Sequence, residues 1–370
     1  MDNIISASLI EQIHKKDGKF IIATAGGGAS AISCLLDVAG ASNTVLSASV
    51  PYHQDELSQY LGGTPDQACS SATARALAMT AWQRARQIED EVPVFGIGFT
   101  AALATNRMRR GDDRCFLAIQ SRDETSLTEI IFDKTNRTRA EEEQLCCALI
   151  VGAMAESLGI EARYQSHFRE SDTFIHSRQI APESWQAVML DKVHSTTADN
   201  PPAIVFPGAF NPIHDGHIAM AKYAQQRLGK DVCMELSIYN VDKPPLDYIE
   251  MQSRLTGMQE WPLSFTKAPT FVEKCRIFPG ATFMVGTDTL IRISDKKYYN
   301  DSADKCITAL KEINAMGNRF LVFGRQSSAG FTTLQDLDIP SILLEICDAV
   351  DETDFREDIS SSQIRANLSS

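Results

Sequence analysis

Residues 203–217 read AIVFPGAFNPIHDGH, and no other stretch limits the fold of this chain as strongly. An apolar, strand-like run over 203–206 breaks at Gly208, and a short loop leads to His214 and His217. The next residues, IAMAKYAQQRLG, carry apolar side chains at helical spacing. A strand, a glycine turn and a helix in this order bring backbone N–H groups and imidazoles to a helix N-terminus, where an anion is stabilised. The stretch therefore predicts a phosphate site between a strand and a helix.

The rest of the chain after residue 202 alternates between strand-like and helical patterns. Strand-like runs are AIVFPGAF, VCMELSIYNV, ATFMVGTDTLIRI, RFLVFGR and SILLEI, and helical ones are DYIEMQSRLTGMQEW, KCITALKEIN and SSSQIRANL. Alternation of this kind predicts a Rossmann-like parallel sheet with right-handed crossovers. The site is then expected at the carboxyl edge of the strands, where the polar motifs fall.

Length, charge and cysteine usage limit the class of protein. With 370 residues the chain predicts two domains, which we place at 1–165 and 203–370, joined by a linker with a short helix at 166–202. A net charge of −13 argues against nucleic acid or an anionic membrane as the main partner. The nine cysteines form no CxxC pair, and the chain shows neither a secretion signal nor a membrane-spanning run. We therefore expect a cytoplasmic protein with reduced thiols.

The first domain reads as an α/β layer domain that begins with a helix, a strand and a three-glycine loop, Gly26–Gly28. CFLAIQS and TSLTEIIFD are expected to form a hairpin, and a helix is expected over 140–158. Three glycines after a strand could admit a phosphate close to backbone N–H groups, or could simply make a tight turn. Both interpretations stay open on the glycines alone.

The segment LLDVAGASNTVLSASVPYHQDELSQYLGG, together with this loop, resembles the CinA C-terminal family, which includes nicotinamide mononucleotide amidohydrolases. The resemblance covers roughly residues 5–160, and the positions that fit its frame are Asp37, Gly40, Ala41, Ser42, Val50, Tyr52, Leu61 and Gly62. Ala25 stands where the family has its nucleophilic serine, Leu57 stands where it has a lysine, and GIGFTAAL lacks its TGIAGP motif. Without a hydroxyl no acyl intermediate forms. We expect a catalytically inactive domain that serves a structural or regulatory role, retains a nucleotide in the glycine loop, or provides a dimer surface.

The second domain resembles the HxGH nucleotidylyltransferases, and most closely the nicotinamide or nicotinate mononucleotide adenylyltransferases. The resemblance covers residues 203–370 and rests on GAFNPIHDGH and on ISSSQIR at 359–365. It implies transfer of AMP from ATP to a mononucleotide with release of pyrophosphate, and Mg²⁺ bound together with ATP. The phosphate of the acceptor attacks directly, so catalysis is positioning and charge neutralisation without a protein nucleophile.

The resemblance also implies roles for individual residues. The expected catalytic residues are His214, His217 and Arg365; those expected to bind ATP are Gly208, Ala209, Phe210, Asn211, Gly216, Gly286, Asp288, Ser361 and Ser362; those expected to bind substrate phosphate are Lys243, Arg254 and Arg325. No protein metal ligands are expected, because phosphate oxygens and water can hold magnesium.

Several alternatives remain open from the sequence. A cytidylyltransferase or another HxGH enzyme with a different phosphorylated acceptor fits the same motifs, and so does a pyridine-nucleotide sensor without turnover. Trp261, Tyr298 or Tyr299 could stack on a pyridine ring. The expected partners are ATP and a phosphorylated small molecule, with a homo-oligomer through the first domain left open.

Overall fold

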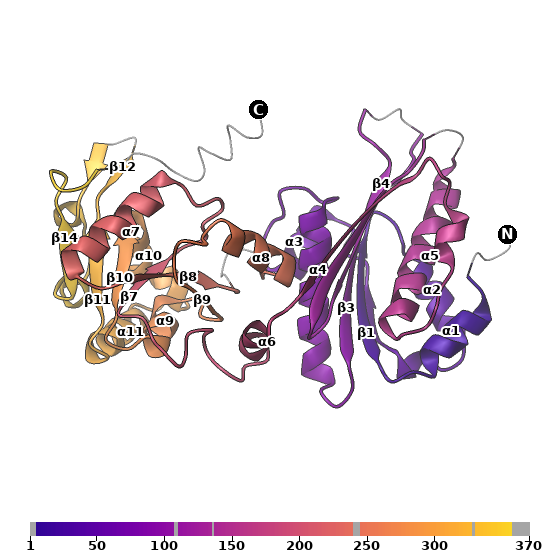
Figure 1. Ribbon diagram of the computed structural model, residues 1–370, viewed down its shortest axis with the longest axis horizontal. Helices are drawn as coiled ribbons and strands as arrows, with labels where there is room; N and C mark the ends of the chain where they lie inside the picture. Colours follow the sequence, from indigo (N-terminus) through magenta and orange to yellow (C-terminus); the bar gives the residue numbers. More distant parts are fainter. Residues whose placement is uncertain (1–4, 107–109, 135–136, 240–244, 328–329, 357–370) are drawn as a thin grey trace. The chain divides into compact units, whose positions relative to one another are not determined.

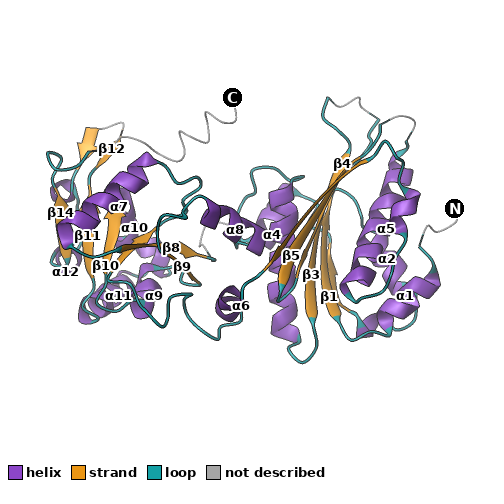
Figure 2. Cartoon of the chain, in the orientation of Figure 1, coloured by secondary structure: helices purple, strands orange, loops and turns teal. Residues whose placement is uncertain are grey.

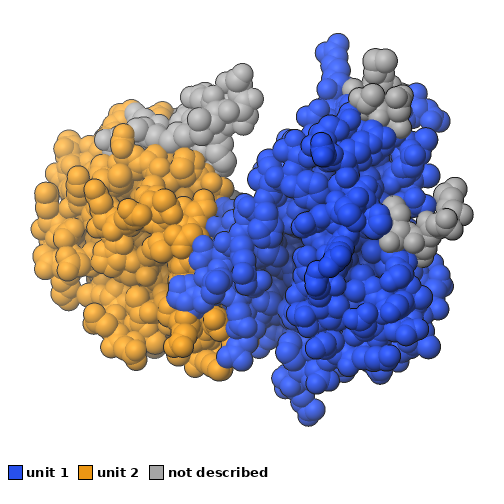
Figure 3. Space-filling view, turned by 45° about the vertical axis from the view of Figure 1, so that its right-hand side comes forward, with its two compact units in different colours: residues 1–182, 242–250 blue, residues 183–241, 251–370 orange. Residues whose placement is uncertain are grey.

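The computed structural model describes residues 5–106, 110–134, 137–239, 245–327 and 330–356 (Figure 1). The chain divides into two compact units, which Figure 3 shows in different colours. The first unit comprises residues 1–182 and 242–250, and the second comprises residues 183–241 and 251–370.

The first unit is built on a six-stranded mixed sheet with the order β2-β1-β3-β4-β5-β6. β1 pairs in parallel with β2 and β3, and β4, β5 and β6 continue the sheet in antiparallel fashion. The strands are β1 (Lys19–Ala25), β2 (Val45–Ser49), β3 (Val94–Ala102), β4 (Arg114–Gln120), β5 (Glu124–Ile131) and β6 (Thr173–Ile180). The expected hairpin is thus confirmed as β4–β5.

Helices cover both faces of this sheet, with α3 and α4 on one face and α1, α2 and α5 on the other (Figure 2). They are α1 (Ala7–His14), α2 (Ser30–Leu36), α3 (Gln54–Leu61), α4 (Ser71–Ile88) and α5 (Arg139–Ser157), with short 3₁₀ turns at Ala41–Asn43 and Tyr164–His167. Gly96 and Gly98 let α4 approach β3, because a Cβ atom at either position would lie 2.0 Å from a carbonyl oxygen of α4. The expected α/β layer architecture is confirmed.

The second unit contains a six-stranded sheet with the order β14-β11-β10-β7-β8-β9, and all of its strand pairs are parallel. Its strands are β7 (Ile204–Pro207), β8 (Val232–Ser237), β9 (Leu263–Thr266), β10 (Thr282–Gly286), β11 (Arg319–Phe323) and β14 (Cys347–Val350). From β7 the chain adds β8 and β9 on one side and β10, β11 and β14 on the other. The order reverses between β7 and β10, so the topological switch point lies at the end of the strand that carries the HxGH loop. The expected Rossmann-like parallel sheet is confirmed.

Helices pack on both faces of the second sheet as well. The remaining helices of the chain are α6 (Glu183–Met189), α7 (Asp215–Leu228), α8 (Tyr248–Thr256), α9 (Phe271–Ile277), α10 (Thr287–Ser294), α11 (Ala303–Ala315) and α12 (Ser341–Leu344). Two 3₁₀ turns lie at Lys296–Tyr299 and Leu334–Asp336, and β12 (Arg325–Ser327) and β13 (Gly330–Thr332) form a small ribbon. Successive residues of β7 face opposite sides. Phe206 contacts His217 of α7, whereas Val205 lies in a core cluster with Cys275 of α9 and Leu310 of α11. Thus α7 and the α9–α11 layer cover opposite faces.

Two expectations from the sequence are corrected by the fold. The expected linker at 166–202 contains β6, which pairs along its whole length with β5. This strand is exposed at almost every position, so it lacks the apolar alternation that marks a strand in a sequence.

The short helix expected in the linker is α6, and its Trp185 packs edge-on against Phe265 at 5.2 Å. The run SILLEI, expected as a strand, forms α12, and the strand β14 follows it.

All nine cysteines are free thiols. In the described ranges no helix is both long enough and apolar enough to cross a membrane. The expected final helix, SSSQIRANL, lies outside the described residues.

Candidate functional site

The loop after β7 is shaped by contacts between its own aromatic and glycine residues. The Gly208 N–H donates to the carbonyl of Glu235 at 3.0 Å, which continues the sheet by one hydrogen bond. Phe210 is buried and has a left-handed backbone with φ 43°. A Cβ atom at position 208 would lie 2.7 Å from the Phe210 ring, so this ring requires glycine there. A bulky residue held at positive φ is unusual and is typical of functional loops.

His214 and His217 lie together at the start of α7. His214 is the N-cap residue, and the two imidazole rings stack with centroids 3.6 Å apart and planes 24° apart. Phe206 and Phe210 pack edge-on against the His217 ring at 5.9 and 5.1 Å. The backbone N–H of His214 donates to Nδ1 of His217 at 3.3 Å. Since Nδ1 accepts this bond, the proton of a neutral His217 resides on Nε2.

The surroundings of both histidines favour their neutral forms. Burial, and then the positive charge of Arg325, lower the pKa of His214. Burial, with added repulsion from His214 and Arg325, lowers the pKa of His217 to about 3. Near pH 7 His217 is therefore a neutral hydrogen-bond donor through Nε2–H, and positive charge at the site comes from Arg325.

The neighbouring strand ends contribute a second group of polar residues. Gly286 is the N-cap of α10, and a Cβ atom there would lie 2.7 Å from Oδ1 of Asp288. Nη1 of Arg325, which follows β11, lies 3.4 Å from the same oxygen, and both side chains are about half exposed. The structure thus gathers the His214–His217 pair, Asp288 and Arg325 at the carboxyl edge where the strand order reverses.

The other residues expected at this site differ in how they are placed. Ala209 and Asn211 are exposed on the loop, and Gly216 is buried in the first turn of α7. Phe210 points inward onto His217, so its ring supports the histidine. Arg254 lies in the last turn of α8. Four further residues lie outside the described part of the chain: Lys243, Ser361, Ser362 and Arg365.

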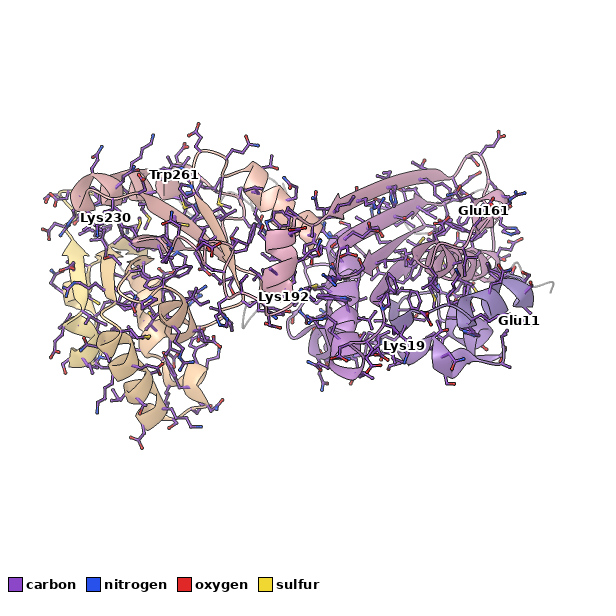
Figure 4. All side chains as sticks on the ribbon, turned by 60° about the horizontal axis from the view of Figure 1, so that its bottom comes forward. Glu11, Lys19, Glu161, Lys192, Lys230 and Trp261 are labelled. Carbon is purple, nitrogen blue, oxygen red and sulfur yellow. The ribbon has the colours of Figure 1, made fainter. Side chains whose placement is uncertain are left out.

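The structure separates the three aromatic candidates for ring stacking. Trp261, labelled in Figure 4, precedes β9, and β9 runs parallel to β8. Trp261 therefore lies just before the amino end of β9, and its stacking role stays a prediction. The Tyr299 hydroxyl donates to the carbonyl of Ile293 at 2.8 Å, and burial raises its pKa to about 12. Tyr299 therefore packs against the core, and the stacking roles of Trp261 and Tyr298 stay predictions.

A buried ion pair beneath the loop was missed by the sequence analysis. Glu235 is fully buried, and its two carboxylate oxygens each lie 2.7 Å from Nζ of Lys274. The Thr266 hydroxyl donates to the same carboxylate at 2.5 Å. Since the Glu235 carbonyl accepts from Gly208, this network fixes the strand against which the loop turns. The sequence does contain one indication of this ion pair: Glu235 stands inside the apolar run VCMELSI, and a charged residue in a buried strand needs a partner.

The glycine loop of the first unit is closed by the protein's own carboxylate. Glu143 of α5 accepts hydrogen bonds from the backbone N–H groups of Gly28 at 2.8 Å and Ser30 at 3.0 Å, and from the Ser30 hydroxyl at 3.0 Å. The amides that a phosphate would contact at this helix start therefore already bind Glu143. Ala25 is buried at the end of β1, and Leu57 is buried in a core cluster. These contacts favour the tight turn over retained nucleotide binding.

Comparison with known proteins gives a class for the second half of the chain. Residues 205–367 match the cytidylyltransferase-like family, so the C-terminal region contains a cytidylyltransferase-like domain. An HxGH nucleotidylyltransferase was expected from GAFNPIHDGH and ISSSQIR, with a cytidylyltransferase as one alternative.

A more particular relative is the Schizosaccharomyces pombe protein named "Putative nicotinamide mononucleotide adenylyltransferase". The two are 33% identical over an alignment of 141 residues, and the match covers 32% of this chain and 56% of that protein. The matched part of the chain thus spans a little over half the length of this curated relative.

Solved structures similar to the N-terminal part are CinA-like. The competence/damage inducible protein CihA from Agrobacterium tumefaciens is 19% identical, with a TM-score of 0.35, and the match covers 43% of this chain and 96% of that one. A competence-damaged protein (CinA) superfamily protein from Escherichia coli is 15% identical, with a TM-score of 0.34, and the match covers 43% of this chain and 91% of that one.

Proposed function

We propose that the second unit is a nucleotidylyltransferase that transfers AMP from ATP to nicotinamide or nicotinate mononucleotide and releases pyrophosphate. The observation that carries this proposal is the stacked His214–His217 pair at the switch point, with Arg325 beside it. The name of the yeast relative supports a pyridine mononucleotide as acceptor. The cytidylyltransferase-like domain supports nucleotide transfer as the reaction class.

The proposed chemistry is a direct displacement at the α-phosphorus of ATP. An oxygen of the acceptor phosphate forms a bond to this phosphorus, while the bond to the oxygen bridging the α- and β-phosphates breaks and pyrophosphate leaves. Negative charge grows on the leaving group during this step. Nε2–H of His217 and the imidazole of His214 donate to phosphate oxygens, and the α7 N-terminus adds its positive dipole end. Arg325 supplies the cationic charge that the neutral histidines do not.

The nucleotide substrate is MgATP. Among the described residues, no group of three histidine, cysteine, aspartate or glutamate side chains could hold a metal ion. In this proposal the triphosphate and water provide most of the magnesium ligands, as is usual for Mg²⁺ bound with a nucleotide.

The closing motif is proposed to hold the β- and γ-phosphates through Ser361, Ser362 and Arg365. In support, the last described residue, Arg356, donates from Nη2 to Gln326 at 3.2 Å. Gln326 follows Arg325 in β12. The chain therefore reaches the Arg325 side of the site shortly before the motif begins in the sequence.

The test is a pyrophosphate-release assay with four combinations: ATP or CTP with nicotinamide or nicotinate mononucleotide. We expect turnover with ATP and at least one of the two acceptors. Turnover with CTP alone would establish the cytidylyltransferase alternative, and tight binding without pyrophosphate would establish a sensor. Turnover in none of the four mixtures refutes the proposed function.

A further inference from the structure

Two adjacent cysteines on α5 of the first unit each face a second cysteine. The Cys147 thiol donates to Sγ of Cys34, on α2, at 3.5 Å. The neighbouring Cys146 is hydrogen-bonded to Cys115, on β4. Because successive residues of a helix point about 100° apart, one pair lies between the two helices and the other lies against the sheet. One helix therefore carries two thiol pairs, and the proposed function uses neither.

The contact that brings Cys34 and Cys147 together repeats along the two helices. One turn earlier, Ser30 of α2 donates to the Glu143 carboxylate of α5 from its backbone N–H and its hydroxyl. Both pairs are separated by 113 residues, so α2 and α5 run in the same direction. The two helices lie on the same face of the sheet (Figure 2). The sulfur atoms therefore meet through helix packing that a second, independent contact anchors.

The two thiol pairs differ in their access to solvent. Cys34 is partly exposed, whereas Cys147 is only 4% exposed. Cys115 and Cys146 are both fully buried. An oxidant in solution can therefore reach Cys34, but it cannot reach the Cys115–Cys146 pair while the unit is folded. Redox-sensing cysteines are typically accessible to solvent and lie next to a second cysteine that resolves them.

The surroundings of Cys147 set the order in which the two thiols react. Burial, and then the neighbouring Cys34, raise the pKa of the Cys147 thiol well above its usual range, and a hydrogen bond from Ser30 opposes this only in part. Cys147 is therefore protonated near pH 7 and is a poor nucleophile toward an oxidant in solution. Its sulfur already lies 3.5 Å from that of Cys34, which is close to the distance of about 3–3.5 Å from which an intramolecular attack proceeds. Cys34 is thus the thiol that meets the oxidant, and Cys147 reacts second.

We propose that Cys34 and Cys147 form a site of oxidative modification, at which a peroxide converts the two thiols into a disulfide that joins α2 to α5. All of its groups lie in the first unit, so the site is independent of the proposed nucleotide transfer. The disulfide lies one helical turn from the Ser30–Glu143 contact and strengthens the same helix pair that closes the glycine loop.

The reaction has two steps. Sγ of Cys34 attacks one oxygen of hydrogen peroxide, the O–O bond breaks, and the departing hydroxide takes the thiol proton to become water. Cys34 is then a sulfenic acid. Sγ of Cys147 attacks Sγ of Cys34, the S–O bond breaks, and the departing hydroxide leaves as water with the Cys147 proton. Together the two sulfurs lose two electrons, and these electrons reduce the peroxide to water.

The experiment treats the reduced full-length protein with a few-fold excess of hydrogen peroxide, alkylates the remaining thiols and digests the protein without reductant. Mass spectrometry should find the Cys34 and Cys147 peptides joined with the loss of two hydrogen atoms, and dithiothreitol should separate them. The Cys115 and Cys146 peptides should stay unlinked. A cross-link between residues 113 positions apart restricts the unfolded chain, so the thermal midpoint of the first unit should rise by roughly 5 °C or more.

Three variants separate the steps. Cys147→Ser keeps the size of the side chain and removes the second thiol, so Cys34 should accumulate as a sulfenic acid that dimedone traps. Cys34→Ser should leave Cys147 unmodified at the same dose of peroxide, because Cys147 is buried. Cys115→Ser is the matched control in the other thiol pair, and it should form the Cys34–Cys147 cross-link at the native rate. The thermal midpoint of each reduced variant shows whether it is folded.

The peroxide dose is calibrated on Cys69, another partly exposed cysteine of the first unit. If the folded native protein forms no Cys34–Cys147 cross-link at a dose that oxidises Cys69, the proposal is overturned. Cross-linking of Cys115 to Cys146 at the same rate would also overturn it, because access to solvent would then not select the site. Equal dimedone labelling of Cys34 in the native protein and in Cys147→Ser would show that Cys147 does not resolve the sulfenic acid, and this too would refute the proposal.

Discussion

Replacement of His217 gives the sharpest test of the site. The ring is held from three sides: His214 stacks on it at 3.6 Å, Phe210 packs at 5.1 Å, and the His214 N–H bonds to Nδ1 at 3.3 Å. These contacts fix the direction of Nε2–H before substrate arrives. A preorganised donor of this kind contributes about 10²–10³ in kcat, or about 2.7–4 kcal/mol, to a step that develops negative charge. We therefore expect His217→Ala to lower kcat by that factor.

The assay is steady-state pyrophosphate release at saturating ATP and acceptor, with the thermal midpoint of each variant measured alongside. His217→Gln keeps an N–H at the end of the side chain but loses the aromatic contacts, so its kcat should lie between those of the native and alanine proteins. His194→Ala, an exposed histidine of the same unit, is the matched control and should retain full activity. A native-like kcat in a folded His217→Ala protein would refute the mechanism.

Three further predictions concern stability. The pKa of His217 is about 3 in the folded protein and near 6.5 in the unfolded chain, so the unfolded state binds more protons between these two pH values. The free energy of unfolding should therefore fall as the pH drops through this window. The urea midpoints measured at pH 7 and pH 5 should differ less in His217→Gln than in the unmodified protein. Lys274→Met leaves Glu235 buried and unpaired, which should cost about 3–5 kcal/mol in urea unfolding, and adding Glu235→Gln should restore much of it. Glu143→Ala removes a carboxylate that accepts three hydrogen bonds, so it should lower the free energy of unfolding of the first unit by roughly 1–3 kcal/mol. The rate of nucleotide transfer should stay unchanged. A folded Glu143→Ala protein with reduced transfer would contradict the placement of the chemistry in the second unit.

Several features were predictable because they depend on local pattern. The strand, turn and helix around His214 follow from apolar spacing and from Gly208, and the structure confirms them as β7 and α7. The alternation after residue 202 likewise predicts the parallel sheet, since a right-handed crossover leaves few topologies. The strand order, and with it the switch point beside the HxGH loop, comes from the structure.

Other features were not predictable, because they join residues far apart in the chain. Glu143 reaches Gly28 across more than a hundred residues, and no spacing rule identifies the carboxylate that fills a distant loop. The sequence of β6 shows no alternation of apolar and polar residues, because both faces of this strand are exposed.

By itself the sequence determined the strand, turn and helix that carry His214 and His217, and the alternation that builds the parallel sheet of the second half. Apolar periodicity and residue type provide this information, because both can be recognised within a single turn, helix or strand. Only the tertiary structure decided that Tyr248, from the second half of the chain, completes the core of the first unit. The burial of Tyr248 depends on α4, β4 and β5 packing together around it. Because these elements are far apart in the chain, no local sequence pattern predicts that they pack against this side chain.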